Sequence, residues 1–262
     1  PRCRTDPAQA MTLPFRFRAA SLHLVASAFI AALAAALVFL VWYPSPYSTL
    51  AGGMGLFLLI VSVDVVMGPA LTAVAASPSK GRAELTRDLA VIVVLQLAAF
   101  GYGLYTMALA RPVALVFEID RFRVVAAADI DTASLAEAPP GLQALPWNGP
   151  RQIAAVKPTD PAEQMKAIEL GMAGFDLSMQ PKYWREYPPL ADAAWRAARP
   201  VPVLLAKYPQ VVDEVTRIAK KVGQPAQALR FLPLMSRQES WVSVIAEPGA
   251  KVVGYLPVEG FF

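Results

Sequence analysis

A single carboxylate stands inside a long apolar run. The segment SVDVVMGPALT (62–72) has Asp64 as its one charged residue, and the Gly68-Pro69 pair follows one helical turn later. A carboxylate in the middle of a membrane-spanning helix costs roughly 2.5–3.5 kcal/mol on insertion scales, so such a residue normally faces other helices and has a partner. Asp64 is therefore the first candidate for a functional site.

Three arrangements would account for Asp64. Counting from the carboxyl end of its helix at 1.5 Å per residue puts it roughly 18 Å deep. Gln96 and Tyr102 in the next apolar run bracket that depth, and a contact with either would lock the helices together. Alternatively, Asp64 and the Gly68-Pro69 kink form a polar notch that receives a partner's membrane helix and its charged amino-terminal end. The third arrangement is a protonated side chain without a particular task.

His23 and Cys3 are the only histidine and the only cysteine. One thiol excludes an intramolecular disulfide and a cysteine zinc cluster. One histidine near the first helix excludes Ser-His-Asp triads and His-rich metal sites from the rest of the chain. At about 6 Å inside its own helix, His23 is expected to lie at the membrane interface, too shallow to be the obvious partner of Asp64.

Glu118 and Asp120 are the remaining pair of acids with a chemical interpretation. Two carboxylates on one strand face could serve as the acid and base of a glycosidase, but ion pairs with Arg121 or Arg123 on a solvated face explain them more simply. The sequence thus predicts no catalytic residue, no metal and no cofactor, and we expect the protein not to be an enzyme.

The elements that hold Asp64 follow from the distribution of charge. Only 17% of the residues are charged, against about 25% in soluble domains, and no charged residue lies between Arg18 and Asp64. A spanning helix needs about 20 apolar residues. Three runs meet that length: Ala19–Val41, Ala51–Ala76 and Leu89–Leu109. The first is longer than the apolar core of a signal peptide, so it is expected to be retained.

The net charge of +4 arises entirely before residue 112. Residues 1–111 hold 8 Lys and Arg against 4 Asp and Glu, whereas residues 112–262 hold 16 of each. The sequence pI of about 9.3 therefore does not indicate nucleic-acid binding, because it comes from the basic flanks of the apolar runs. Those flanking residues are Arg16, Arg18, Lys80, Arg82 and Arg87.

This asymmetry predicts the topology by the positive-inside rule. The amino terminus and the connection 77–88 are expected in the cytoplasm, because the first connection has no Lys or Arg. Trp42, Tyr43 and Tyr47 in that first connection are expected to form an aromatic belt at the membrane surface. Three spans then place everything after Arg111 in the periplasm, on the far side of a bacterial inner membrane.

The expected organisation has three parts. A cytoplasmic segment (1–18) precedes a three-helix transmembrane region (19–111), which carries a periplasmic domain (112–262). Pro1–Ala10 is polar and unpatterned and Met11 is a natural start, so these ten residues are expected to be an artefact of cloning or of the gene start.

The periplasmic part is expected to be an α+β domain with a mainly antiparallel sheet and helices on one side. Residues 113–125 alternate with a period of two and predict one strand. Thr159–Gly171, with an apolar face of Met165, Ile168 and Met172, predicts a helix. Further helices are predicted at Leu190–Ala198 and Gln210–Val222, and strands at 228–235, 240–247 and 251–258, the last two joined by a turn at 248–250.

Several segments resemble one known family. FRFRAASLHL, VFLVWYPSPYSTLAGGMGLFLLIVSVDVVMGPALT, ELTRDLAVIVVLQLAAFGYGLY and ARPVALVFEIDRFRVVAAADI occur in that order. GLQALPWNGPR, QPKYW and RFLPLMSR…WVSVI…VVGYLP follow them. Together these are similar to the type IV pilin accessory proteins of the TfpX/TfpZ family, from Met11 to the end of the chain. The second connection, SKGRAELTRD, is less basic than is usual there, and Pro1–Ala10 has no counterpart.

The resemblance implies an inner-membrane accessory protein or chaperone that acts on its cognate major type IV pilin during pilus assembly, without enzymatic activity. Its expected partners are that pilin, through its apolar amino-terminal helix and its globular head, and the lipid bilayer, but no nucleic acid. Two other classes stay open: a membrane-anchored periplasmic sensor that binds a small ligand, and a subunit of an envelope enzyme. A pilin gene beside this one would favour the pilin accessory protein over both alternatives.

Overall fold

The computed structural model describes residues 7–77, 80–237 and 240–262, with side chains from Phe15 onward. Cys3 and the first six residues of the expected artefact lie outside the described part, as do residues 78–79 of the predicted cytoplasmic connection. The chain folds as two compact units. One comprises the chain up to Leu40 and Gly53–Ala108, and the other comprises Val41–Gly52 and Leu109–Phe262.

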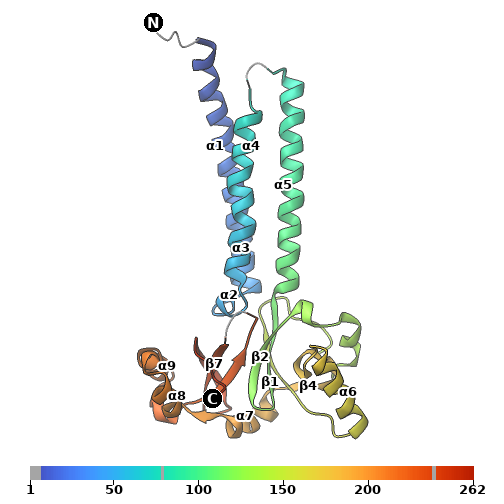
Figure 1. Cartoon of the computed structure of the whole chain (residues 1–262), viewed down its shortest axis with the longest axis vertical. Helices are drawn as coiled ribbons and strands as arrows, with labels where there is room; N and C mark the ends of the chain where they lie inside the picture. The colour runs from blue at the N-terminus through green and yellow to red at the C-terminus, as the bar shows by residue number, and fades with distance from the viewer. Residues whose placement is uncertain (1–6, 78–79, 238–239) are drawn as a thin grey trace. The chain divides into compact units, whose positions relative to one another are not determined.

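The first unit consists of long apolar helices (Figure 1). Three of them, Phe15–Trp42, Gly53–Ala75 and Arg82–Ala110, are long and apolar enough to cross a membrane, as predicted. Their segments are α1 (Pro7–Ala36) with the π-helical η1 (Leu37–Trp42); α3 (Gly53–Ser62), the π-helical η2 (Val63–Met67) and α4 (Gly68–Ala75); and α5 (Arg82–Ala110).

Small residues let these helices approach closely. A Cβ atom built on Gly103 of α5 would lie 2.6 Å from Cγ2 of Ile60 in α3, so only glycine fits there. Close approach at small residues is a common way of packing membrane helices. On the other side, α1 and α4 lie side by side (Figure 1).

The second unit is built on one mixed sheet. Its strand order is β4-β3-β1-β2-β6-β7-β8, with β5 paired to β6. The strands are β1 (Pro112–Glu118), β2 (Arg121–Ala126), β3 (Arg151–Ala155), β4 (Trp184–Glu186), β5 (Arg199–Pro200), β6 (Arg230–Met235), β7 (Ser240–Ala246) and β8 (Lys251–Leu256). The prediction of a mainly antiparallel sheet is wrong, because β1 pairs with β3, and β2 with β6, in parallel. Long connections return the chain beside the central hairpin in the same direction, which a parallel pair requires.

That central hairpin corrects the single strand predicted at 113–125. The segment folds into β1 and β2, which pair antiparallel across a tight turn. Ile119 takes the turn with φ of 57°, a left-handed conformation that β-branched residues seldom adopt. The apolar alternation runs through the turn, so the sequence gives no sign of it.

Helices flank the sheet at both ends of the unit. Of the predicted helices, α6 (Pro161–Met172), α7 (Ala191–Ala197) and α9 (Val212–Val222) are present, whereas α8 (Val201–Lys207) was not predicted. Asp160 caps α6 by accepting a hydrogen bond from the Glu163 amide at 2.9 Å, and Gly223 ends α9 with φ of 69°. Single turns complete the unit: α2 (Tyr47–Leu50) and 3-10 turns at Ala127–Asp129, Thr132–Glu137, Leu177–Met179, Pro181–Tyr183, Pro188–Leu190, Pro209–Val211 and Ala226–Ala228.

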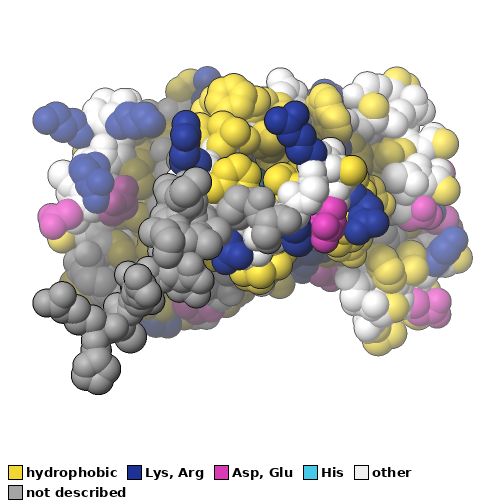
Figure 2. Space-filling model, turned by 90° about the horizontal axis from the view of Figure 1, so that it is seen from above, with side chains coloured by type: hydrophobic (Ala, Val, Ile, Leu, Met, Phe, Trp, Pro, Cys, Tyr) yellow, Lys and Arg dark blue, Asp and Glu magenta, His cyan; other side chains and the backbone are white. Residues whose placement is uncertain are grey.

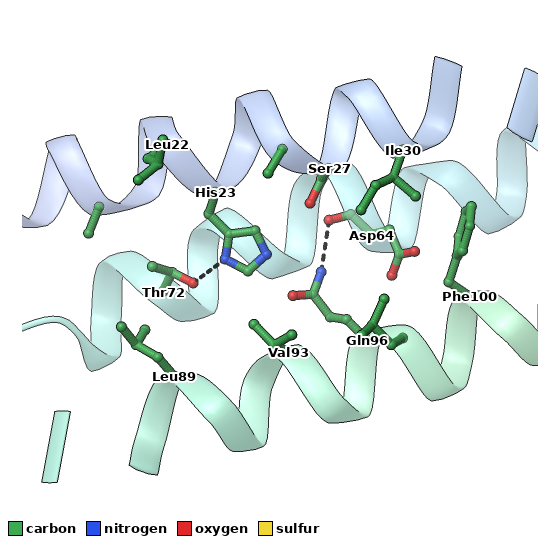
Figure 3. Close-up of a pocket in the computed structure, with 13 residues that line it drawn as sticks. Leu22, His23, Ser27, Ile30, Asp64, Thr72, Leu89, Val93, Gln96 and Phe100 are labelled. Atoms are coloured by element: carbon green, nitrogen blue, oxygen red, sulfur yellow. Dashed lines mark hydrogen bonds between the residues drawn. The ribbon is translucent and has the colours of Figure 1, made fainter. Parts of the chain in front are cut away.

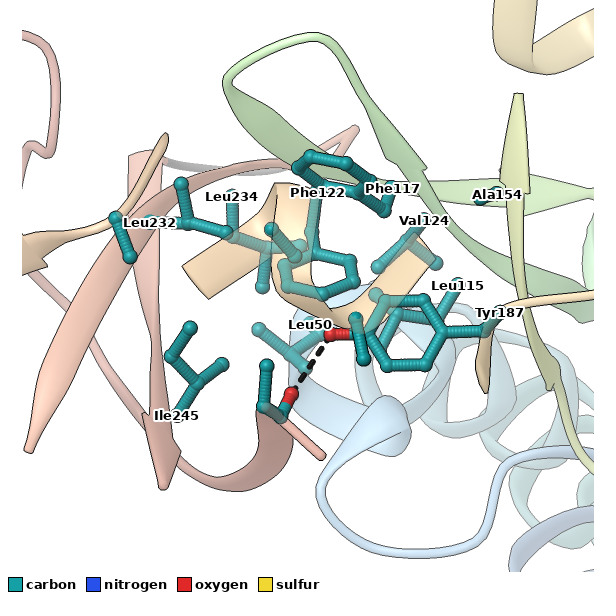
Figure 4. Close-up of a cluster of buried hydrophobic side chains, with 14 residues drawn as sticks. Leu50, Leu115, Phe117, Phe122, Val124, Ala154, Tyr187, Leu232, Leu234 and Ile245 are labelled. Atoms are coloured by element: carbon teal, nitrogen blue, oxygen red, sulfur yellow. Dashed lines mark hydrogen bonds between the residues drawn. The ribbon is translucent and has the colours of Figure 1, made fainter. Parts of the chain in front are cut away.

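The core of the second unit includes a residue from the connection between the first two long helices. Leu50 is fully buried and packs with Phe122, Tyr187 and Ile245 (Figure 4). The Tyr187 hydroxyl donates to the carbonyl of Ala250 at 2.7 Å in the same cluster. The connection is thus a structural part of the folded domain.

The strands at the end of the chain contribute to the core. Of four side chains from these strands that were expected to be buried, two are fully buried. Phe231 and Val244 are fully buried in a second cluster beneath α8 and α9. Trp241 and Tyr255 are only partly buried against the first cluster. The three strands from residue 230 onward therefore carry much of the packing.

The apolar face of α6 does not contribute to the core. Met165, Ile168 and Met172 are 58%, 57% and 78% exposed. The helix is held by its other side, where the Tyr183 hydroxyl donates to Glu163 Oε2 at 2.8 Å. This leaves an apolar stripe on the surface, which in a soluble domain commonly marks a contact site.

Candidate functional site

The described helical unit contains a cavity of about 350 Å³ between α1, α4 and α5. Most of its walls are apolar, but five polar residues reach it: His23, Ser27, Asp64, Thr72 and Gln96 (Figure 3). His23 and Ser27 come from α1, Asp64 and Thr72 from the second apolar helix, and Gln96 from α5. Polar groups from three helices therefore meet inside an apolar bundle.

Asp64 lies in a π-helical turn, η2, and this explains its contact with Gln96. In the π register a carbonyl accepts from the amide five residues later, and five residues after Asp64 stands Pro69, which has no amide hydrogen. The carbonyl of Asp64 instead accepts from Nε2 of Gln96 at 3.1 Å. A turn of this kind is rare and occurs frequently at functional sites.

Gly68 makes room for that bond. A Cβ atom at Gly68 would lie 2.0 Å from Nε2 of Gln96, so a larger residue would displace the amide. The other amide atom, Oε1 of Gln96, is buried and has no hydrogen-bond partner among the described residues. Gln96 is thus fixed by its nitrogen while its oxygen remains an unused acceptor.

His23 and Thr72 form the other polar contact in the cavity. Nδ1 of His23 and Oγ1 of Thr72 share a hydrogen bond of 2.6 Å, and Thr72 is 3% exposed. No hydrogen bond joins His23 to Asp64 among the described residues, but the two line the same cavity and interact electrostatically. The sequence did not indicate Thr72 as a member of the site, because an isolated threonine in an apolar helix carries no signal.

Tyr102 occupies a different position from Gln96. It is 72% exposed and lines a second pocket of about 270 Å³, which Asp64 also borders. No hydrogen bond between Asp64 and Tyr102 occurs among the described residues, whereas the contact with Gln96 is present. Of the five predicted partner-binding residues, Gln96 lies against Asp64 and Gly68, Pro69 follows in the same helix, and Tyr102 shares only the lining of the second pocket with Asp64.

The polar groups of this site can form hydrogen bonds to a ligand. Among the described residues no group of His, Cys, Asp and Glu side chains could hold a metal ion. The cavity offers a carboxylate and an unpaired amide oxygen, both of which accept hydrogen bonds. The described lining includes no Lys or Arg that could neutralise the carboxylate.

The acids considered for glycosidase chemistry form ion pairs in the second unit. Arg123 Nε lies 3.5 Å from Glu118 Oε1, and Arg121 Nε lies 2.8 Å from Asp120 Oδ1. The buried Glu118 also accepts the Ser178 amide through Oε2 at 3.0 Å. This arrangement fixes the loop beside the hairpin and leaves no free acid–base pair there.

The residues of the predicted aromatic belt, Trp42, Tyr43 and Tyr47, pack against other residues of the second unit. Tyr43 is fully buried and Trp42 is 6% exposed, because both pack within the second unit. The Trp42 and Trp147 rings lie 5.8 Å apart, and the hydroxyls of Tyr47 and Tyr255 share a hydrogen bond of 2.9 Å. Burial raises the pKa of Tyr43 to about 12, with Arg237 and Arg111 opposing the rise.

The basic flanks lie at one end of the helical unit, where α1 and α5 begin and α4 ends (Figure 1). Figure 2 looks onto this end and shows Lys and Arg side chains bordering apolar ones. Lys80 Nζ pairs with Asp88 Oδ2 at 2.7 Å. The basic flanks of the helices consist of Arg16, Arg18, Lys80, Arg82 and Arg87.

Comparison with known proteins gives consistent matches. A family model described as fimbrial assembly protein FimB matches residues 12–52. The serogroup I fimbrial assembly protein of Dichelobacter nodosus is 33% identical over 248 residues, 94% of this chain and 96% of the relative. The serogroup E1 protein of that organism is 32% identical over 249 residues, again 94% and 96%. That of serogroups C1 and C2 is 44% identical over 116 residues, 44% of this chain and 88% of the relative.

No solved structure matches the chain significantly. The family model ends at residue 52, so it covers the first long helix and the connection that packs into the second unit. The two longer alignments take in both units, including the cavity around Asp64. The chain therefore belongs to the fimbrial assembly protein family, a family of type IV pilus accessory proteins.

Proposed function

We propose that the protein is an inner-membrane accessory protein that binds the cognate major type IV pilin and promotes or modulates pilus assembly. Its relatives are named fimbrial assembly proteins, which supports a role in pilus assembly. The names of the relatives suggest a role in assembly without enzymatic activity.

In this proposal the three long helices span the inner membrane. The basic residues at one end of the helical unit are cytoplasmic by the positive-inside rule, and the second unit, apart from its connection 41–52, follows the third span. The amino terminus is then cytoplasmic and the sheet domain periplasmic. The protein can therefore contact a membrane-held pilin both within the bilayer, through its helices, and in the periplasm, through its sheet domain.

The observation that carries the proposal is the cavity around Asp64. A carboxylate inside a membrane bundle normally faces a partner, and the described lining provides no Lys or Arg for it, with His23 as its one basic neighbour. The Gln96 amide donates to the main-chain carbonyl of Asp64 and also hydrogen-bonds its carboxylate, but an amide brings no positive charge. The missing partner is then supplied from outside, by the apolar helix of the pilin lying in the notch.

The test is photo-crosslinking in native membranes, with a crosslinking amino acid placed at Leu97 in the cavity wall. The Asp64→Asn variant keeps the shape but removes the charge, so we expect normal accumulation with loss of pilin capture and of surface pili. Ser62→Ala is the matched control, because the Ser62 hydroxyl bonds within its own helix, to the Leu59 carbonyl at 2.8 Å. Full capture and piliation with Asp64→Asn would make the aspartate structural and refute the notch.

The globular head of the pilin is the proposed partner of the exposed stripe on α6. Met165, Ile168 and Met172 offer flexible and apolar contacts that suit an adaptable surface. Replacing Ile168 with Asp should leave the domain folded, since the side chain is 57% exposed, and should lower pilin capture from the periplasmic side. Unchanged capture by crosslinkers on this helix would exclude it from the contact.

A further inference from the structure

We propose that the cavity beside Asp64 binds an ammonium group, namely the amino-terminal amine of the partner's apolar helix. This inference rests on the proposed function, because it takes the pilin helix as the occupant. It adds the chemical group that is recognised and the depth at which it is held.

The charges of the cavity select a cation. Two acceptors line the cavity, the Asp64 carboxylate and the buried Oε1 of Gln96, and no Lys or Arg stands beside them in the described lining. A primary ammonium carries three donors and no acceptor, so it complements both. Hydrogen bonds between charged groups are also roughly twice as strong as neutral ones. A neutral or anionic ligand would leave the carboxylate without the charge of a Lys, an Arg or a ligand cation to balance it in apolar surroundings.

The walls select an apolar carrier for that cation. Leu22, Ile30, Val93 and Phe100 surround the polar groups (Figure 3). A volume of about 350 Å³ is within the range of ligand sites in proteins. A cavity of this size can hold the end of a helix but cannot enclose the whole helix. The remainder of the bound helix would lie along the exposed apolar faces of the bundle.

The position of the cavity gives the height of the bound end. Polar groups extend along α4 and η2 from Thr72 to Asp64, eight residues or roughly 12 Å apart. Asp64 itself lies roughly 16 Å from the end of α4. In the proposed topology, a helix whose amine reaches Asp64 is raised by that distance from the cytoplasmic face. The protein would hold its partner partly lifted out of the bilayer.

The experiment uses the full chain in phosphatidylcholine nanodiscs. The probe is a synthetic peptide with the sequence of the cognate pilin's apolar amino-terminal helix, labelled at its carboxyl end, in free-amine and N-acetylated forms. We expect the free amine to bind about tenfold to a hundredfold more tightly, as for a charge-assisted hydrogen bond. Asp64→Asn should abolish the difference, and Ser62→Ala should preserve it.

Equal affinity of the wild-type protein for both peptides would overturn the ammonium site while leaving helix binding intact. Failure of both peptides to bind would overturn the proposed pilin notch as well. Nanodiscs containing phosphatidylethanolamine supply the alternative amine from a lipid. If they reduce binding of the free-amine peptide to the acetylated level, the cavity holds a lipid amine and the assignment to the helix end is wrong. An unchanged difference supports it.

Discussion

Leu50 tests whether the connection between the first two long helices is part of the folded sheet domain. The residue lies in a single turn, α2 (Tyr47–Leu50), yet its side chain is fully buried with Leu115, Phe122 and Ile245. Leu50→Ala removes its buried apolar atoms and leaves a cavity in a core that neighbouring strands can only partly fill. Such substitutions cost roughly 2–5 kcal/mol.

Full burial and the rigid surroundings place Leu50→Ala near the middle of that range, at about 3 kcal/mol. With a urea slope of about 2 kcal/mol per M, the midpoint for unfolding of the second unit should fall by about 1.5 M. The measurement is urea unfolding of the full chain in detergent micelles, followed by pulse proteolysis of sites in the sheet domain. The same cost reduces the folded-to-unfolded ratio on the order of a hundredfold.

Leu58→Ala is the matched control. The side chain lies in α3 and is 58% exposed, so its truncation should leave the midpoint of the sheet domain almost unchanged. A shift for Leu50→Ala no larger than that for Leu58→Ala would show that the connection does not stabilise the domain. Residues Val41–Gly52 would then belong to the second unit by their contacts but would not stabilise it.

Three further predictions concern topology, core and pH. Periplasm-dependent phosphatase fused after residue 115 should be active and after residue 79 inactive; the reverse pattern would overturn the proposed orientation. Truncation at Leu229 removes β6, β7 and β8 with the buried Phe231 and Val244. Burial of each of these two side chains contributes roughly 1.5–3 kcal/mol to folding, so the truncated domain should unfold and be degraded. Accumulation of a functional fragment would refute this. Because burial raises the pKa of Tyr43 from 10 to about 12, its contribution to stability is complete below pH 10 and is lost as pH rises toward 12; Tyr43→Phe should lessen that loss in urea titrations, and an unchanged slope would contradict it.

The elements that depend on local sequence were predictable. Long apolar runs fix the three long helices, because charges within them are costly in lipid and accordingly rare, Asp64 being the exception. Asp160 before Pro161, and Gly223 after Val222, mark helix ends through capping and a left-handed turn. The hairpin of β7 and β8 follows from its Pro-Gly turn. In each case the signal and its effect lie within a few residues of each other.

The long-range pairings could not be predicted in this way. Ile119 turns the chain inside an apolar alternation, and the parallel partners of β1 and β2 are brought in by later segments. Trp42, Tyr43 and Leu50 read as membrane-surface and linker residues, because their partners, among them Trp147, lie about 100 residues away. Only the tertiary structure shows that they are core residues.

The candidate site combines both situations. Asp64 was predictable because a charge in an apolar helix needs a reason, and Gln96 followed as a donor at similar depth. The mode of contact was not. The Gln96 amide donates to the main-chain carbonyl of Asp64, because the π register places Pro69 where an amide should donate, and it also hydrogen-bonds the carboxylate. A proline five residues after a carboxylate has no such effect in an α-helix, so the sequence alone does not show the main-chain contact. An uncharged amide cannot neutralise the carboxylate, and this is why the charge at Asp64, not its packing, is the quantity to vary.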